Sequence, residues 1–547
     1  MEQATFQPGS LDELITALQA ERPDAPPDAV AELTRRLLSR GSAEFLAADP
    51  LEEVVDTLTR LYALVDAATP GEVSVRTAWD PDDPTRGVLQ TVMDDCPFIV
   101  DTIREHVHSL GLHIPHLLHP VVSIHRDEAG GVVEIGERTA EGHTTSVVHM
   151  TMEGVLDDEA RAALNDELRT RLDQVTAVTA DFAEMRARVD GVIDELQRRK
   201  AQAEGLTADL EEVQELLRWM KDPGFVFLGY RAYLVEPDES GRTFVTAEVG
   251  TGLGILRDES RSRHARPTAV EDLPPELRAR TLGGPLLIIS KTNSESPIRR
   301  RVQMDYIGIK RFGPGGEMRG EHRFLGLLTA KAYNQDASTI PILRRKLREV
   351  LEIEEAPKGS HDYNLILQTF NSMPKEELFL STPEEIRAVV EAVMETEGAD
   401  DVRVTSRPDS LGRGHNVLVI LPKNRYSAAV RRRLQSALTD TYHGRLLNYH
   451  LALGRTDQAR LHFYVSHDRE HPGPETAVLE AVVRETVRSW DEKLVEALVA
   501  AHGPKEGQKL GERYATSFPA SYQAAIDVAS AVDDVSQLDA LDRMTAQ

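Results

Sequence analysis

Cysteine is nearly missing from this sequence, because Cys96 is the only one in 547 residues. A single cysteine excludes an internal disulfide framework and a cysteine-rich zinc site. The sequence also lacks an uncharged run of roughly 18 residues, the length of a membrane span. Its start, MEQATFQPGSLDELITALQ, has no basic end followed by an apolar stretch, as a signal peptide would have. We therefore expect a cytoplasmic protein with no membrane partner.

Positive charge is scarce too: 63 Lys and Arg against 90 Asp and Glu give a net charge of −27. Binding to a nucleic-acid backbone requires clustered Lys and Arg, so we predict no nucleic-acid partner. One local basic group, Arg299–Arg301 with Lys310 and Arg311, is interpreted as a solvated strand edge, with an anion contact as the alternative.

Nucleotide-binding signatures are missing as well. The pattern GxxxxGK[ST] does not occur, and GTGLG (Gly250–Gly254) is followed by ILRDESRSRHARP. That segment is not the apolar helix that a dinucleotide fold packs against its sheet. We predict a flexible turn at GTGLG and no cofactor site in this chain.

What the sequence does contain is enough chain for several domains, with 41% hydrophobic and 28% charged residues, as in ordinary globular proteins. The spacing of apolar residues switches repeatedly between the helical and the extended period. The predicted order is a helical segment (1–75), a small α+β module (76–156), a long helical linker (157–222), an antiparallel β domain (223–335), a helical linker (336–400), a second α+β module (401–470) and a C-terminal helical segment (471–547).

The two small modules share the order strand–helix–strand–strand, which predicts α+β sandwiches. In the first, the strand Gly87–Asp95 precedes a helix that begins after Pro97. In the second, HNVLVILP precedes the amphipathic segment YSAAVRRRLQSALTDTY. The first helix has one apolar stripe, formed by Ile99, Val100, Ile103, Val107 and Leu110.

Between the modules, a helical pattern runs from Asp157 to Lys200 with the apolar spacing of a coiled-coil seam. Such a seam needs a partner, in the same chain or in another. Beyond it, two strands, a short helical insert and three strands predict a five-stranded antiparallel sheet with one covered face. The seam consists of Leu164, Leu168, Leu172, Val175, Phe182, Met185, Val189, Val192 and Leu196.

Histidines gather in the stretch MDDCPFIVDTIREHVHSLGLHIPHLLHPVVSIH, which begins at Met93. On a helix His106 and His108 point in nearly opposite directions, and on a strand His116 and His119 lie on opposite faces. Zinc needs three or four ligands that converge at about 2 Å. We therefore predict no metal site among the six, which are His106, His108, His113, His116, His119 and His125.

The same stretch holds two adjacent carboxylates and the cysteine. Asp94 and Asp95 lie at a strand-to-helix turn, where carboxylates are common helix caps, so we interpret them as caps rather than as an acid and a base. Both oppose a lowered pKa at Cys96, which argues against a reactive thiol. We identify no catalytic, cofactor-binding or metal-binding residue from residue chemistry alone.

Longer motifs carry a resemblance to a known family. TVMDDCPFIVDTIREHVHSLGLHIPHLLHPVVSIHRD is similar to the first ACT-like domain of the large bacterial NAD-dependent glutamate dehydrogenases. LLRWMKDPGFVFLGYRAY, ISKTNSESPIRRRVQMDYIGIKRF and RFLGLLTAKAY resemble the PAS-like segment that follows it. SRPDSLGRGHNVLVILPKNRYSAAVRRRLQ resembles the second ACT-like domain, and RSWDEKL the helices after it. The resemblance implies two ACT-like, ferredoxin-type sandwiches and a PAS-like antiparallel sheet domain joined by long helices.

It also implies a parent enzyme that oxidatively deaminates L-glutamate to 2-oxoglutarate and ammonia with NAD. In that family a third ACT-like domain, the catalytic domain and its Rossmann domain follow, and none has a counterpart in this sequence. The chain is then a non-catalytic N-terminal regulatory and oligomerisation region, with the catalytic region supplied in cis or in trans. We expect self-association through the ACT-like and PAS-like modules, and the alternative is a stand-alone amino-acid-sensing protein.

One departure from effector-binding ACT domains concerns the turn Asp94–Asp95–Cys96–Pro97–Phe98. Such domains usually place a glycine after the proline, which leaves room for an effector carboxylate. Phe98 occupies that position here, so the turn is expected to serve as an interface rather than as an amino-acid site.

Overall fold

The computed structural model describes residues 10–545 apart from 40–44, 46–48, 138–143, 201–206, 263, 284, 314, 316, 397–400, 409–413, 454–456 and 468–472. The chain divides into two compact units, Met1–Asn334 and Gln335–Gln547, and each is described by itself. Both units combine antiparallel sheets with helices, which confirms the predicted α+β class.

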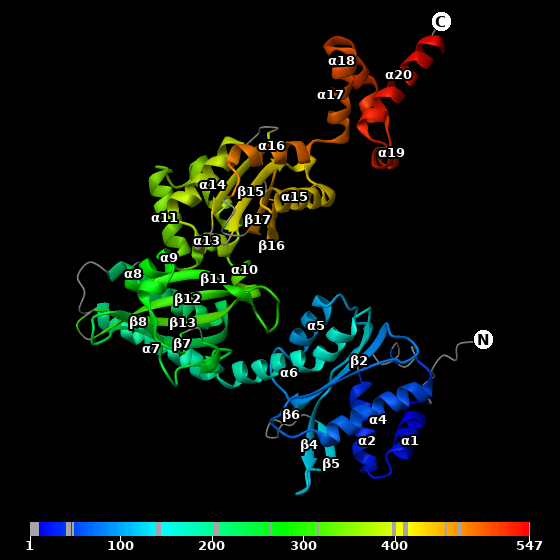
Figure 1. The fold of residues 1–547 in the computed structure, drawn as a ribbon, viewed down its shortest axis with the longest axis vertical. Coiled ribbons are helices and arrows are strands. Elements are labelled where there is room, and N and C mark those ends of the chain that lie inside the picture. The colour runs from blue at the N-terminus through cyan, green and yellow to red at the C-terminus, as the bar shows by residue number, and fades with distance from the viewer. Residues whose placement is uncertain are drawn as a thin grey trace. The chain divides into compact units, whose positions relative to one another are not determined.

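In the described part of the first unit, α1, α2 and α4 precede an antiparallel sheet in the order β1-β2-β6-β4-β5, with the short β3 also pairing with β6 (Figure 1). The helix α5 follows β2 directly, as the sequence predicts. The elements are α1 (Ser10–Glu21), α2 (Pro27–Leu37), α4 (Leu51–Ala67), β1 (Ser74–Trp79), β2 (Arg86–Asp94), α5 (Ile99–Ser109), β3 (Leu117–Leu118), β4 (Val121–Arg126), β5 (Val132–Glu137) and β6 (Thr144–Glu153).

Helices cover both faces of this sheet. Leu58 and Leu61 of α4 share one apolar core with Val92, Val122 and Val147 of the strands, and α1 and α2 extend that core. On the other face Ile99, Ile103 and Val107 of the predicted stripe on α5 are buried, whereas Val100 and Leu110 are only partly buried. This helix packs against α6 (Asp158–Ala180). The alternation of side chains along a strand supplies one apolar row for each layer.

The second unit repeats this plan with β14 (Arg403–Pro408), β15 (Gly414–Pro422), α15 (Ala428–Thr441), β16 (Arg445–Leu453) and β17 (Gln458–Ser466), in the order β14-β15-β17-β16. The helix α16 (Thr476–Val487) packs on α15 and β14, as α6 packs on α5 and β1. A ferredoxin-type sandwich runs β-α-β-β-α-β. Here the edge strand comes first, so the second sandwich runs β-β-α-β-β-α. The first runs the same way with two further strands, β3 and β5, between α5 and β6. The sequence prediction missed β1 and β14.

The predicted helix over Asp157–Lys200 is wrong in one respect, because it is two helices, α6 and α7 (Phe182–Lys200), that meet at Asp181. At this break Phe182, which was predicted to lie in the seam, is 42% exposed. Val178, which was not in the predicted seam, is only 1% exposed. The other seam residues are buried within the chain itself. The helices α8 (Thr207–Trp219), α9 (Pro275–Leu282) and α10 (Ala330–Asn334) complete this unit.

The middle sheet has seven strands rather than the predicted five, in the order β10-β8-β7-β13-β12-β11 with β9 on β7. The extra strands, β9 and β10, are two residues each and too short to leave an apolar period in the sequence. The strands are β7 (Phe225–Pro237), β8 (Thr243–Ala247), β9 (Leu253–Gly254), β10 (Thr268–Ala269), β11 (Leu287–Glu295), β12 (Gln303–Phe312) and β13 (Met318–Leu328).

In the second unit, Ala392 and Val393 of α14 cover Leu418 and Ile420 of β15, on the sheet face opposite α15 and α16. The last helices form a separate apolar core of their own. The elements are α11 (Leu343–Ile353), α12 (His361–Ser372), α13 (Lys375–Leu380), α14 (Pro383–Glu395), α17 (Trp490–His502), α18 (Pro504–Tyr514), α19 (Ala520–Ala525) and α20 (Val528–Thr545).

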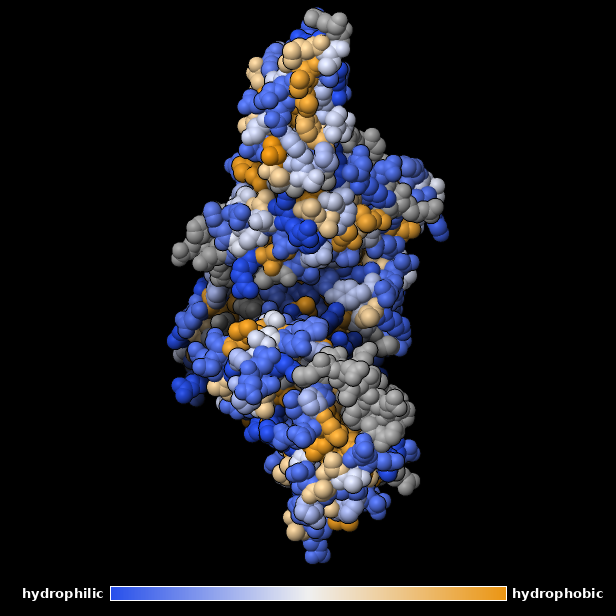
Figure 2. Space-filling view, turned by 90° about the vertical axis from the view of Figure 1, so that its right-hand side faces the viewer, coloured by the Kyte–Doolittle hydropathy of each residue, from blue (hydrophilic) through white to orange (hydrophobic). Residues whose placement is uncertain are grey.

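Hydrophilic residues dominate the face seen in Figure 2, and apolar residues form small groups there, including a line over the end made of α17–α20. Exposed apolar side chains of α20 include Leu538, Leu541 and Met544. Among the described residues, none of the helices combines the length and the hydropathy that crossing a bilayer requires.

Candidate functional site

The turn Asp94–Phe98 joins β2 to α5, as predicted. The Asp95 N–H donates to the Thr144 carbonyl of β6 (2.7 Å), which ties the turn to the sheet. Phe98 stands at the N-cap of α5 with a φ of +79°, a left-handed conformation that is strained for a bulky residue. The N-cap position of α5 is occupied by Phe98, whose side chain makes no capping hydrogen bond, and not by Asp94 or Asp95.

Cys96 is half-buried and packs toward α6. Burial raises the pKa of its thiol, the nearby Thr179 hydroxyl partly offsets this rise, and the charges of Asp95 and Asp94 add to it. A thiol with a raised pKa stays protonated at neutral pH and is a poor nucleophile. The turn therefore has the chemistry of a structural element.

A loop from the middle sheet reaches this turn and its helix. The loop connects β11 to β12 and comprises residues 296–302, hereafter the docking loop. The Arg299 N–H donates to the buried Thr102 hydroxyl (3.1 Å), and the Arg301 N–H donates to the Glu105 carboxylate (3.3 Å). The Arg299 guanidinium lies over the Phe98 ring, 5.7 Å from its centre. The bulky residue of the turn is thus one side of a contact inside the chain.

The docking loop is itself built tightly. Ser296 and Ile298 are each 1% exposed and hydrogen-bond to one another, and Arg299 has a φ of +67°. Arg171 of α6 donates to the Pro297 carbonyl (3.2 Å). The basic group Arg299–Arg301, interpreted as a solvated strand edge, therefore joins α5 to the middle sheet through its backbone.

The predicted histidines scatter over this region. His106 is buried on α5, and burial, with smaller contributions from Arg171 and Arg301, lowers its pKa to about 4. His119 falls between strands and contacts the Ser146 hydroxyl (2.9 Å), whereas His125 is exposed on β4. Within the described ranges, His, Cys, Asp and Glu side chains form no group of three that would hold a metal ion.

Sequence reasoning missed Asp181, which sits at the break between α6 and α7. Its buried carboxylate accepts from the Gly254 N–H (2.7 Å) and the Arg257 guanidinium (3.0 Å). Gly254 has a φ of +59°, and a Cβ there would meet the Leu228 carbonyl oxygen, so only glycine fits. The last residues of GTGLG, Leu253 and Gly254, form β9, and Asp181 holds Gly254 in place.

Comparison with known families agrees with this arrangement. Sequence models of glutamate dehydrogenase match the chain in four places: the ACT1 domain at residues 33–168, helical motif 1 at 340–398, the ACT2 domain at 403–491 and helical motif 2 at 497–541. The matches fall on the two permuted sandwiches and on the helices of the second unit. The chain belongs to the family of large NAD-specific glutamate dehydrogenases.

Individual relatives point the same way. The NAD-specific glutamate dehydrogenase of Halomonas elongata is 28% identical over 510 residues, covering 87% of this chain and 31% of the relative. The enzyme of that name from Pseudomonas aeruginosa is 24% identical over 490 residues, covering 88% of this chain and 30% of the relative. The one from Mycobacterium tuberculosis is 26% identical over 424 residues, covering 74% of this chain and 25% of the relative. The chain thus spans less than a third of the length of these relatives.

Proposed function

We propose that this chain is the N-terminal regulatory and oligomerisation region of a large cytoplasmic NAD-dependent glutamate dehydrogenase. The parent reaction converts L-glutamate, NAD and water into 2-oxoglutarate, ammonia and NADH, and a catalytic region outside this chain carries it out. The observation that carries the proposal is the order of the four family matches along a chain that covers 31% of its relative. The middle seven-stranded sheet takes the place of the PAS-like domain.

Several contacts support a regulatory role. The docking loop makes two backbone hydrogen bonds and a cation–π contact with α5, so a shift of α5 would pull directly on the middle sheet. Helices cover both faces of each ACT-like sheet, which leaves strand edges such as β16 for pairing between copies.

The catalytic part of the proposal is tested with the purified chain, L-glutamate and NAD, by following NADH absorbance. We expect no turnover from the chain alone and turnover when the C-terminal remainder of the enzyme is supplied in cis or in trans. Turnover by the chain alone would overturn the proposal. Sedimentation equilibrium tests the oligomerisation, and a chain that stays monomeric at all accessible concentrations would refute that part.

The transmission of a signal is tested with Thr102→Val, which removes the acceptor of the Arg299 N–H. We expect faster hydrogen exchange in the docking loop and an altered effector response of the assembled enzyme. Asp101→Ala, one residue away on the exposed side of α5, is the matched control and should change neither. Equal behaviour of the two variants would show that the contact transmits nothing.

A further inference from the structure

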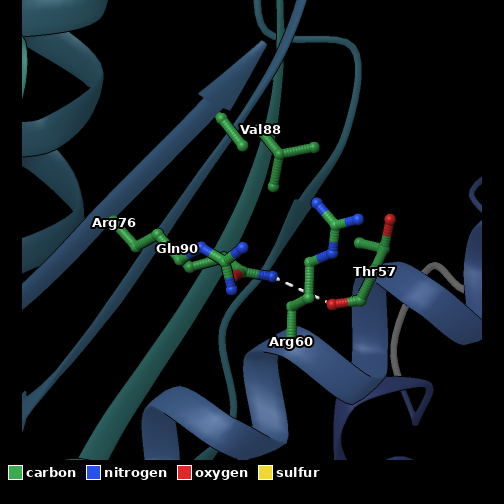
Figure 3. Close-up of a pocket in the computed structure, with 6 residues that line it drawn as sticks. Thr57, Arg60, Arg76, Val88 and Gln90 are labelled. Carbon is green, nitrogen blue, oxygen red and sulfur yellow. Dashed lines mark hydrogen bonds between the residues drawn. The ribbon is translucent and has the colours of Figure 1, made fainter. Parts of the chain in front are cut away.

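A small pocket lies between α4 and the first two strands of the N-terminal sheet, away from the turn and the docking loop. Figure 3 shows side chains from these three elements converging on it. The cavity volume is about 40 Å³. Its lining residues are Thr57 and Arg60 of α4, Arg76 and Ala78 of β1, and Val88 and Gln90 of β2.

Two of the lining residues are arginines and none is acidic. Arg60 pairs with Asp56 on the same helix (2.7 Å), but both side chains are about half exposed, so this pair contributes little and exchanges readily. Among the described residues, no carboxylate lies within ion-pair distance of Arg76. In a chain with a net charge of −27, two arginines that line one pocket with a single half-exposed carboxylate partner between them require an explanation.

The polar wall of the pocket is already ordered. The Gln90 side chain is 2% exposed and donates from Nε2 to the Thr57 carbonyl (3.1 Å), the bond drawn in Figure 3. This bond holds β2 against α4. This wall of the pocket therefore keeps its place without a ligand, and the ordering cost of binding falls on the two arginine side chains.

Size and chemistry together define the ligand. A cavity needs roughly 10–15 Å³ to hold one water, so the space found here takes about three small atoms. That is the size of an oxyanion head group and is too small for a nucleoside or an aromatic ring. A guanidinium presents paired donors that match a carboxylate or phosphate group. Ala78 and Val88 add an apolar wall for a short aliphatic stem.

We propose that this pocket is an anion site, in which Arg60 and Arg76 bind the head group of a small carboxylate or phosphate. The site is formed by α4, β1 and β2, so its occupation links the helical cover to the edge strand. A bound anion would hold α4 on the sheet and stabilise the first sandwich. Its regulatory meaning rests on the proposed function, whereas the binding itself is a property of this chain.

The test is isothermal titration of the full 547-residue chain with succinate and, separately, with inorganic phosphate at constant ionic strength. We expect saturable binding of at least one of them, and the one that binds identifies the source of the oxyanion. Arg76→Gln should weaken binding about tenfold or more, since one charged, paired hydrogen-bond contact is lost. Asp56→Asn frees Arg60 and should leave binding equal or tighter.

Arg104→Gln is the matched control, because Arg104 is an exposed arginine on α5 outside the pocket. Its affinity should equal that of the unmodified chain. Arg76→Lys keeps the charge and serves if the glutamine variant does not fold, with an intermediate affinity expected. Absence of binding by both anions, or equal affinity in Arg76→Gln, Arg76→Lys and Arg104→Gln, would overturn the site. Neither result bears on turnover or assembly, so it is distinguishable from failure of the proposed function.

Discussion

In mild acid the chain is expected to lose stability, and His149→Leu is expected to make that loss smaller. His149 lies on β6, is fully buried, and packs its ring edge-on against Phe45. Its Nδ1 contacts the Gln90 amide (3.3 Å), and Nε2 has no hydrogen-bond partner among the described residues. Burial, with a smaller contribution from His116, lowers its pKa from 6.5 to about 4.

The sign and the size of the effect follow from proton linkage. Between pH 6.5 and pH 4 an unfolded histidine is protonated, whereas the folded His149 stays neutral, so acid favours the unfolded state. From pH 7 to pH 5 this difference costs the folded state about 2 kcal/mol. A leucine at this position takes up no proton, and the variant should therefore lose about 2 kcal/mol less over the same range.

The assay is hydrogen exchange of the β6 amides at pH 7, 6 and 5, corrected for intrinsic rates, because a chain with several domains does not unfold in one step. The matched control is His125→Leu, since His125 is 68% exposed on the neighbouring strand and should leave the pH dependence unchanged. If His149→Leu and the unmodified chain lose the same protection between pH 7 and pH 5, the reasoning from burial is refuted.

Three further substitutions test the packing. Asp181→Ala should destabilise the α6–α7 junction by about 2–4 kcal/mol, because a buried N–H and a guanidinium lose their acceptor. The control is Asp194→Ala, which changes an exposed residue and should cost under about 0.5 kcal/mol. Hydrogen exchange of the β9 amides distinguishes the two variants. Ile103→Ala should cost about 2–5 kcal/mol by urea unfolding of the first unit, since Ile103 is fully buried, and a loss under 1 kcal/mol would contradict that burial. Ser489→Ala removes the capping box of α17 and should cost about 1 kcal/mol, visible as faster exchange in the first turn of that helix and nowhere else.

The sequence predicts the parts of this fold whose period is long and regular. The stripe on α5 identified Ile99, Ile103 and Val107, all of which are buried. The edge strand β1, SVRTAW, is short and carries polar residues, so its period is too weak to detect. The break at Asp181 was missed because an acidic residue inside a helical pattern gives no sign of the backbone N–H that it binds from 73 positions away.

The candidate site was predictable only in part. The turn Asp94–Phe98 was located correctly, and Phe98 was identified as its unusual residue. Its contact with Arg299 joins elements about 200 residues apart, and no local pattern encodes such a pairing. The anion pocket was not foreseen either, because Arg60 and Arg76 lie on a helix and a strand that meet only after folding.

The early position of β1 decides where the chain can be cut. A fragment that begins at Gly87, where the first predicted strand starts, would lack the edge strand β1. It would also lack the helices α1, α2 and α4, which cover one face of the sheet. Val92, Val122 and Val147 would then face water. Burying one such side chain is worth about 1.5–3 kcal/mol, so this fragment would aggregate instead of folding. A fragment that is meant to contain the intact first sandwich must therefore include the residues from Ser10 onward.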